Sequence, residues 1–416
     1  MDGGRVTKPG ETARFGRRRE DVIHAASALI NELGVKGTTF AELARSVGLN
    51  ATSITYYFDR KDKLVVAVFA STLDWLEEAA RDAAALRDPQ DRLRAFIAAH
   101  VGLRRRIRLG EKGLITALSE IRTLDEDAQA PLLEQYGRVV DHVRSFFGDN
   151  RTGERRALDT ARAHILLEAM FWWPVWSLRY SVRDFARLED RMFDIFARGL
   201  AAEQGDWSPL PLESGPWRGT AGEGETADAF LRSATVMINQ RGYRGASVNR
   251  IAAALNVTKG SFYHHHNAKD DLVFECFEKS YDRLSAVQIA ARETDASVWS
   301  QIASALAELI DLQFNDPMPL LRTAALAALP SDERGNVVVR SNRLANRFAG
   351  MIADGIAEGS VRAVDPMVAS QIMMPALNGA YEARAWAARQ PDAATAVKLY
   401  AWTLAAGVFS DPPEFA

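Results

Sequence analysis

Residues 34–65 read GVKGTTFAELARSVGLNATSITYYFDRKDKLV, and residues 242–273 read GYRGASVNRIAAALNVTKGSFYHHHNAKDDLV. The two stretches align without a gap at an offset of 208 residues. The same offset pairs three further sets of identical residues along the chain, namely Phe69 with Phe277, Asp184 with Asp392, and Gly199 with Gly407. A repeat of this length is too long for a solenoid unit, whose period is roughly 20 to 50 residues. The sequence therefore predicts two whole domains of one kind in series.

Each copy predicts three short helices around a small core. In the first copy the apolar residues recur at helical spacing and leave a polar outer face. Thr39 and Glu42 form a capping-box pair, Gly48 ends one helix, and Asn50 can cap the next by accepting a backbone N–H. In the second copy Asn256 replaces Gly48, and asparagine tolerates the left-handed conformation better than most residues. Both copies thus predict two helices joined by a tight turn.

Such a pair of helices suits the DNA major groove when the second helix is exposed and rich in hydrogen-bond donors. One such turn also occurs in helical proteins for packing alone, but two copies favour DNA binding. At these residues the sequence resembles the TetR family of bacterial transcriptional regulators, most specifically in the run TKGSFYHHHNAKDDLV at residues 258–273. The resemblance covers nearly the whole chain, twice. It implies an all-α fold of two tandem TetR-like units, each a three-helix helix-turn-helix domain followed by a helical ligand-binding and dimerisation domain.

The chain is accordingly expected to have six segments. These are a basic N-terminal arm (1–17), a first helix-turn-helix DNA-binding domain (18–64), a first helical ligand-binding and dimerisation domain (65–205), a linker (206–225), a second helix-turn-helix domain (226–272) and a second helical ligand-binding and dimerisation domain (273–416). The linker is dense in proline and glycine. Residues 1–19 carry six basic and two acidic side chains in a chain of net charge −3. The arm either contacts DNA phosphates or is a solvated, disordered terminus.

The family pattern assigns candidate DNA contacts position by position. It implies backbone contacts for Lys61 and Lys269 at the start of the fourth helix, and for Thr39 and Ser247. In the second copy it implies further contacts to bases and phosphates by Asn249, Thr258, Lys259, Tyr263 and His264. Asparagine pairs naturally with adenine, so Asn249 is the candidate base reader.

The first recognition helix departs from the family pattern. Thr55 stands where tyrosine is usual, which leaves direct base reading open there, although Asn50, Thr52, Thr55, Tyr56 and Tyr57 offer contacts. In the second copy His266 replaces Phe58 of the first. We therefore expect the two recognition helices to read different sequences.

Helices are expected throughout the rest of each half, in the first half at residues 69–81, 90–107, 112–121, 131–147, 155–180 and 182–203. Residues 165–178 are apolar on every side, as are residues 372–386 in the second half, so both helices should be buried all round. The resemblance implies that such a helix lines a ligand cavity on one side and joins the dimer's four-helix bundle on the other. The candidate ligand contacts are Glu168, Phe171, Trp172, Trp176, Met373, Leu377 and Tyr381. An aromatic stripe is also typical of ordinary core, and the polar His164 and Glu168 either orient a ligand or meet an arginine such as Arg104 or Arg105.

The sequence argues against several other classes of function. Adjacent residues on a helix point about 100° apart, so residues 264–266, all histidine, do not converge on one metal ion. Cys276 is the single cysteine, which excludes a disulfide framework and a thiolate zinc cluster. No glycine-rich phosphate loop, HExxH pair or recognisable Ser/His/Asp arrangement is present, so we expect no catalytic residue, metal or cofactor. There is no long apolar run, and we expect a cytoplasmic protein without a membrane segment.

These patterns predict a sequence-specific DNA-binding transcriptional regulator, a repressor released by a small hydrophobic or aromatic ligand. We expect the two halves to pair within one chain as a pseudo-dimer, residues 155–203 against 365–409. The recognition helices would then lie about one DNA turn, roughly 34 Å, apart on a double-stranded operator. A further homodimer of chains stays open. The alternatives are a helical small-molecule-binding protein or enzyme with vestigial helix-turn-helix segments, and a regulator that uses only its second DNA-binding head.

Overall fold

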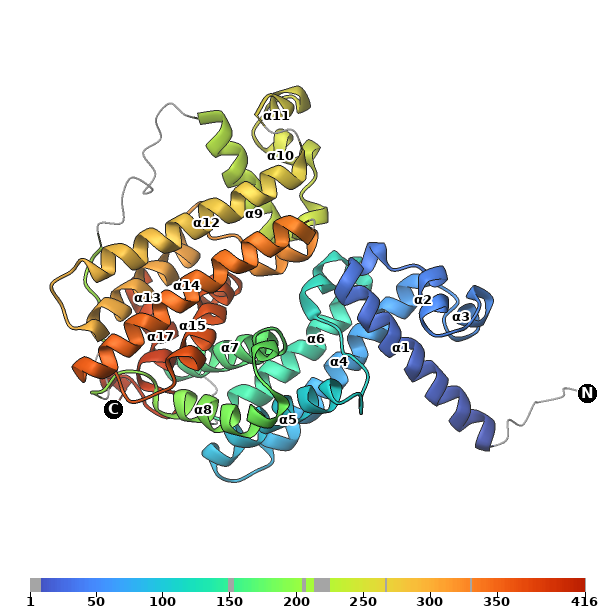
Figure 1. The fold of residues 1–416 in the computed structure, drawn as a ribbon, viewed down its shortest axis with the longest axis horizontal. Coiled ribbons are helices and arrows are strands. Elements are labelled where there is room, and N and C mark those ends of the chain that lie inside the picture. Colours follow the sequence, from blue (N-terminus) through green and yellow to red (C-terminus); the bar gives the residue numbers. More distant parts are fainter. Residues whose placement is uncertain are drawn as a thin grey trace, which may run out of the picture. The chain divides into compact units, whose positions relative to one another are not determined.

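The computed structural model describes residues 9–148, 153–203, 207–212, 225–265, 268–329 and 331–415. The chain divides into two compact units (Figure 1). Unit 1 comprises residues up to 81 together with 102–139, and unit 2 comprises residues 82–101 and everything from 140 onward. Within the described residues the one strand-like pairing is an isolated bridge between Ala201 and Val361, and the all-α fold class is confirmed.

Unit 1 is built from the first three helices and parts of three longer ones. Its elements are α1 (Pro9–Gly37), α2 (Phe40–Ser46), α3 (Ala51–Tyr57), most of α4 (Lys61–Ala84), the end of α5 (Pro89–Arg108), the 3-10 helix η1 (Leu118–Thr123) and most of α6 (Glu126–Arg144). The backbone of α1 leaves helical geometry at Gly34, where φ is 70°. Because α1 begins at Pro9, the second half of the expected N-terminal arm is helical, while residues 1–8 lie outside the described residues.

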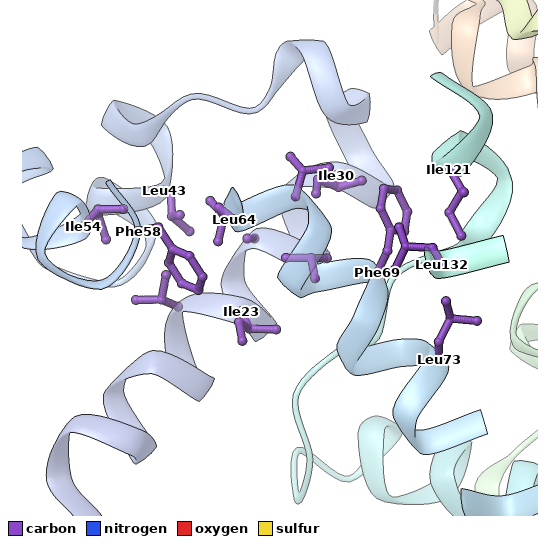
Figure 2. Packing of buried hydrophobic residues seen from close by; sticks show 14 of the residues in the cluster. Ile23, Ile30, Leu43, Ile54, Phe58, Leu64, Phe69, Leu73, Ile121 and Leu132 are labelled. Atoms are coloured by element: carbon purple, nitrogen blue, oxygen red, sulfur yellow. The ribbon is translucent and has the colours of Figure 1, made fainter. Parts of the chain in front are cut away.

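The core of unit 1 runs without a break from the short helices into η1 and α6. Figure 2 shows Ile54 and Phe58 at one end, Ile121 and Leu132 at the other, and Phe69 of α4 towards the second end. All five side chains are at most 5% exposed. Since α4 contributes to both ends, its side chains connect η1 and α6 with the helices α2 and α3 in one packed core.

Unit 2 holds the second set of short helices and most of the longer helices that follow the short helices in each half. Its elements are α7 (Gly153–Trp176), η2 (Ser177–Arg179), η3 (Val182–Asp184), α8 (Phe185–Arg198), α9 (Glu225–Gly245), α10 (Val248–Ala254), α11 (Lys259–His265), α12 (Lys269–Arg292), α13 (Val298–Asn315), η5 (Thr323–Ala328), α14 (Ser331–Glu358), α15 (Pro366–Gly379), η6 (Ala380–Ala383), α16 (Arg384–Ala387), α17 (Ala393–Ala406) and η7 (Pro413–Phe415). Gly242 in α9 repeats the break of α1, again with φ of 70°.

Two helices from each half of the sequence pack together inside unit 2. Both α7 and α8 contact both α15 and α17 (Figure 1). At the 208-residue offset α8 corresponds residue for residue to α17, and α7 covers the range that contains α15. We call these four helices the pairing bundle.

The turns that end α8 and α17 are reciprocal. The amide of Leu200 donates to the carbonyl of Leu404 at 2.9 Å, and the amide of Val408 donates to the carbonyl of Phe196 at 2.8 Å. These two bonds exchange under the 208-residue offset. The same exchange of contacts characterises a two-fold symmetric dimer interface, in which residue i contacts j and j contacts i.

One expected helix, at residues 112–121, is wrong. Residues 113–117 carry no helix, and only the 3-10 helix η1 follows them. The apolar spacing of Ile115, Leu118 and Ile121 suggests a helix locally. The backbone instead makes hydrogen bonds with α1 and α4, as described below. The candidate segment boundaries stay predictions.

Candidate nucleic-acid interface

The polar residues around the first turn hold its geometry. Thr39 Oγ1 accepts from the amide of Glu42 at 3.2 Å, and the Glu42 carboxylate accepts from the amide of Thr39 at 3.1 Å, so the predicted capping box is confirmed. Asn50 Oδ1 accepts from the amide of Ser53 at 2.7 Å and caps α3. Gly48 between them has φ of 65°. The starts of both helices, α2 and α3, are therefore fixed by neighbouring residues.

The outer face of α3 presents hydroxyl and phenol groups. Thr52 and Thr55 are exposed, and Tyr56 is 73% exposed. Phe15 of α1 lies against the rings of Tyr56 and Tyr57, with ring centroids 5.6 and 5.0 Å away. This aromatic group restrains the two tyrosines without burying the Tyr56 ring. A surface of this kind offers hydrogen bonds and apolar contact but no cation of its own.

The second copy repeats the capped first helix and the left-handed turn residue with different side chains. Ser247 Oγ accepts from the amide of Arg250 at 3.3 Å and caps α10. Asn256 has φ of 55°, which confirms the predicted left-handed residue in the place of Gly48. Asn249 is exposed on the outer face of α10, and Thr258 is exposed just before α11.

The recognition helix α11 has one buried and one exposed aromatic side chain. Phe262 is fully buried and packs against Phe230 of α9, with ring centroids 5.7 Å apart. Tyr263 is 51% exposed, and the Lys259 ammonium lies 5.7 Å from its ring centroid. His264 belongs to α11, but its side chain lies outside the described part of the chain, as does residue 266 altogether. The outward face of α11 therefore carries a cation and a phenol.

The two lysines assigned to the DNA backbone also hold the end of the first helix of each head. Lys61 Nζ donates to the carbonyl of Lys36 at 3.1 Å, and Lys269 Nζ donates to the carbonyl of Tyr243. The Lys269 ammonium also lies 3.5 Å from the centroid of the Tyr243 ring. An ammonium has three N–H donors, so a phosphate contact is compatible with this capping role.

Two asparagines that the sequence analysis passed over join each helix-turn-helix domain to its body. Asn31 Nδ2 donates to the carbonyl of Ile115 at 2.9 Å, and its Oδ1 accepts from the amide of Ala117 at 2.8 Å. Asn239 does the same with the carbonyl of Leu320 at 2.9 Å and the amide of Arg322 at 3.0 Å. We call residues 115–117 the first strap and residues 320–322 the second strap.

The middle residue of each strap is held by the fourth helix of its head. The amide of Thr116 donates to Thr72 Oγ1 at 3.1 Å, and the amide of Leu321 donates to Ser280 Oγ at 2.8 Å. Asn31 and Asn239 stand at the 208-residue offset, as do Thr72 and Ser280. The identical or similar polar residues at these two pairs of positions were thus the signal in the repeat that could have indicated how the straps are held.

The second strap has a buried connection to the pairing bundle. Gln313 of α13 is fully buried; its Oε1 accepts from the amide of Leu320 at 3.1 Å, and its Nε2 donates to the carbonyl of Leu377 in α15 at 3.2 Å. Next to it, Asn378 Nδ2 donates to Thr323 Oγ1. The residue at the position of Gln313 in the first half is Arg105. A hydrogen-bonded chain therefore runs from α15 through the strap to α9.

The candidate ligand residues lie on two helices of the pairing bundle and just beyond one of them. Phe171 and Trp172 are partly exposed and stack edge to face, whereas Trp176 is buried against Trp173 with ring centroids 4.7 Å apart. The indole N–H groups of Trp173 and Trp176 are both buried without a hydrogen-bond partner among the described residues. In the second half the candidate side chains Met373, Leu377 and Tyr381 are all buried.

The polar residues on α7 meet the second half of the chain. The Tyr400 hydroxyl donates to the carbonyl of Ala376 at 2.9 Å, which leaves its oxygen to accept from His164 Nδ1 at 3.1 Å. Burial lowers the pKa of His164 to about 4 and raises the pKa of Tyr400 well above its usual value, with the Glu168 charge adding to the second effect. Glu168 lies against Gly379 of α15. The imidazole is therefore neutral and acts as a hydrogen-bond donor.

The structure gives no support for metal or thiol chemistry in the part of the chain it describes. No group of three or more His, Cys, Asp or Glu side chains there is arranged to hold a metal ion. Cys276 is buried, and burial raises the pKa of its thiol to about 12. None of the described helices combines the length and apolar character needed to cross a bilayer.

Comparison with known proteins gives matches in both halves. Residues 22–68 and 230–276 each match the family of bacterial regulatory proteins called tetR. Over 85 residues the chain is 36% identical to the HTH-type transcriptional regulator BetI of Burkholderia ambifaria, and over 82 residues it is 38% identical to BetI of Stenotrophomonas maltophilia. These matches cover 20% and 19% of this chain and 44% and 42% of the relatives, so the chain spans less than half of each relative's length.

Solved structures give matches of lower identity. A structure of AibR in complex with isovaleryl coenzyme A and operator DNA has 21% identity and a TM-score of 0.34, covering 43% of this chain and 97% of that one. The ketosteroid transcriptional regulator KstR2 of Mycobacterium tuberculosis has 19% identity and a TM-score of 0.38, covering 45% and 97%. The two family matches lie 208 residues apart, on the two sets of short helices described above. Each half of the chain therefore carries a domain that matches the tetR family of bacterial regulatory proteins, and the two TetR-like units stand in tandem.

Proposed function

We propose that this chain is a sequence-specific DNA-binding transcriptional regulator, a repressor that acts as an intramolecular pseudo-dimer and is released by a small hydrophobic or aromatic ligand. The observation that carries the proposal is the presence of two helix-turn-helix domains, each with a left-handed residue in its turn and exposed side chains on its second helix. Recognition helices of this kind read base edges in the major groove.

The outer faces of α3 and α11 favour an operator with two unlike halves. The helix α3 presents Thr52, Thr55 and Tyr56, whereas α11 presents Lys259 and Tyr263. Hydroxyl groups accept or donate to several bases, while an ammonium favours phosphates and guanine. A symmetric palindrome would therefore suit at most one of the two helices.

The pairing bundle gives the two halves the connection that a homodimer obtains from a second chain. Helices from both halves pack with reciprocal backbone bonds at Leu200 and Val408. Two heads joined in this way engage one duplex together, so the second contact is made at a high effective concentration.

Two features support a ligand that acts through the pairing bundle. The unsatisfied indole N–H groups of Trp173 and Trp176 favour an aromatic ligand with a hydrogen-bond acceptor, because a buried donor without a partner costs about 1 to 3 kcal/mol. In the second half, Gln313 connects α15 to the strap that Asn239 holds. A ligand that changes the position of α15 would thereby bias the second DNA-binding head between two arrangements.

Selection of bound duplexes from a random pool tests the proposal. The expected product is a site with two unlike half-sites, each lost separately when Tyr56→Ala or Tyr263→Ala is used in the selection. Both tyrosines are exposed, so neither change removes core packing. Exposed Leu133 on α6 gives a matched control, since Leu133→Ala should leave the selected site unchanged.

No enrichment at low ionic strength would refute the proposal, because non-specific and specific binding are both strongest there. Enrichment of a single half-site that depends on Tyr263 alone would refute the pseudo-dimer and identify a regulator with one working head.

A further inference from the structure

The pairing bundle joins equivalent helices through side chains that are not equivalent. The helices of the bundle correspond under the 208-residue offset, and the backbone bonds at Leu200 and Val408 exchange the roles of the two halves. In a homodimer the two contacts of such a pair are identical by symmetry. In this chain they can differ, and at three positions they do.

The first difference is steric. Gly379 of α15 lies against Glu168 of α7 so closely that a Cβ at Gly379 would fall 2.5 Å from Glu168 Cγ. The offset exchanges this pair for Ala376 and Phe171. One crossing of the helices therefore places a large residue of the first half on the smallest residue of the second. The equivalent positions at the other crossing are Phe171 of the first half and Ala376 of the second.

The second difference is polar. His164 donates to the Tyr400 hydroxyl oxygen at 3.1 Å, and Tyr400 is fully buried. The offset exchanges this pair for Ile372 and Met192, which are both buried and apolar. The hydrogen bond thus exists on one side of the bundle only.

The third difference is ionic. Arg162 of α7 has a side chain that is only 3% exposed; its guanidinium pairs with Asp159 at 2.9 Å and with Asp411 at 3.0 Å, and it also donates to the carbonyl of Ser410. Its counterpart in the second half is Ser370, which is too short and carries no charge. The tail of the second half is therefore held by the first half without the reverse contact.

We infer that the pairing bundle selects unlike halves: the surface formed by α7 and α8 fits that of α15 and α17 and rejects a second copy of itself. This inference rests on the pairing in the proposed function. In a pair made of two first halves, Glu168 would face Phe171 at both crossings of the helices. In the present chain Glu168 faces Gly379, and there is no space for a larger side chain. Two second halves would place Ala376 against Gly379 twice and leave unfilled space. Such surfaces favour pairing of the first half with the second half of the same chain. They disfavour a dimer of chains in which each half pairs with its identical copy.

The test uses the full chain, folded first and then cut once at a protease site introduced within residues 213–224. Native mass spectrometry of the cut protein, after incubation at low concentration so that partners exchange, separates unlike pairs from the two kinds of like pair by mass. Wild-type protein should contain unlike pairs in at least about tenfold excess over like pairs, whereas random partner choice gives about equal amounts. The segment 207–212, whose Ser208 and Leu210 bond to α13, stays with the first half in every sample.

The decisive variant combines Glu168→Ala with Gly379→Phe. Each crossing of the helices then has one alanine and one phenylalanine, as Phe171 and Ala376 already provide at the other crossing. It should raise the proportion of like pairs several-fold, while the polar and ionic differences at His164 and Arg162 still favour unlike pairs. Val175→Ala on the exposed side of α7 is the matched control and should keep the wild-type excess. If the double variant does not fold, Glu168→Ala alone should still give first-half pairs, because it removes the obstacle to them.

Like pairs at the random proportion in the wild-type sample would overturn the inference, and so would a folded double variant that stays as selective as the wild type. Neither result bears on DNA binding by the uncut chain, which the duplex selection measures separately. Conversely, a chain that binds no duplex but keeps its unlike pairs would refute the proposed function and leave this inference standing.

Discussion

Gly199 and Gly407 each pack against the backbone that leads into the other. A Cβ at Gly199 would overlap the carbonyl of Ala405, and a Cβ at Gly407 would lie 2.5 Å from the carbonyl oxygen of Ala197. Both glycines have positive φ, 68° and 84°. Each position therefore requires glycine for two reasons, its backbone conformation and the absence of space.

Replacing either glycine by alanine should destabilise the chain by more than about 2 kcal/mol, because strain and overlap with backbone add. Gly359 is the matched control in the same unit, with φ of 92° and no atom within 4 Å of the methyl group that alanine would add. Gly359→Ala should cost only about 1 kcal/mol. Urea unfolding of Gly199→Ala, Gly407→Ala and Gly359→Ala measures the three values, and equal losses would mean that the close approach does not matter.

The two strap asparagines should differ in their contribution to stability although both bind the backbone of their strap through a carbonyl and an amide. Asn239 is 1% exposed, so Asn239→Ala leaves a buried carbonyl and a partly buried amide unpaired and should cost about 3 kcal/mol. Asn31 is exposed, and water can replace it, so Asn31→Ala should cost about 1 kcal/mol. Denaturant unfolding of the two variants tests this order, and a larger loss at Asn31 would contradict it.

Three substitutions in the second head should separate positioning, base reading and folding. Lys259 is exposed, so Lys259→Ala should weaken binding to all duplexes without changing the free energy of unfolding. The slope of the logarithm of the binding constant against the logarithm of the salt concentration should fall in magnitude by about 1. Asn249→Ala should cost about 1 to 3 kcal/mol of binding at one base position. Lys269→Ala should lower both binding and the unfolding midpoint, because Lys269 also holds Tyr243.

Filter binding at several salt concentrations, together with thermal unfolding, measures these effects. If Asn249→Ala weakens binding to every sequence equally, then Asn249 does not read a base. An unchanged unfolding midpoint for Lys269→Ala would show that its bond to the end of α9 contributes no stability.

His100 should make the chain less stable in mild acid. Burial lowers its pKa to about 4, although its bond to the Phe96 carbonyl opposes this, while the unfolded chain has an ordinary value near 6.5. Between these two values the unfolded state binds a proton that the folded state does not. Stability is therefore complete above about pH 6.5 and falls towards pH 4 by up to about 1.4 kcal/mol per pH unit.

The His100→Gln variant isolates this effect, since His164 has a lowered pKa for the same reason and adds to the slope. The difference in unfolding free energy between wild type and variant should change with pH from 6.5 to 4 and stay constant above 7. A difference that is the same at pH 5 and pH 7.5 would contradict the buried neutral state of His100.

Local patterns sufficed to predict the helix-turn-helix domains. The capping box at Thr39 and the left-handed Asn256 both depend on neighbours within a few residues, and the structure confirms both. The repeat predicted the tandem organisation for the same reason, because two copies of one pattern fold in one way.

Features that depend on distant partners could not be read from the local pattern. Residues 113–117 have helical spacing of apolar residues but form no helix, since Asn31 and Thr72 bind their backbone from elsewhere in the chain. The partner of His164 was also out of reach, because Tyr400 lies 236 positions later. The roles of the exposed residues in DNA binding stay predictions, since they depend on a duplex as well as on the chain.

The backbone bonds at Leu200 and Val408 lie within a single chain, so they form part of its own unfolding equilibrium. The melting temperature of a two-chain regulator falls on dilution, because its monomers separate. Here the melting temperature should be independent of dilution, and both heads should stay joined even when a cell contains only a few copies of the protein.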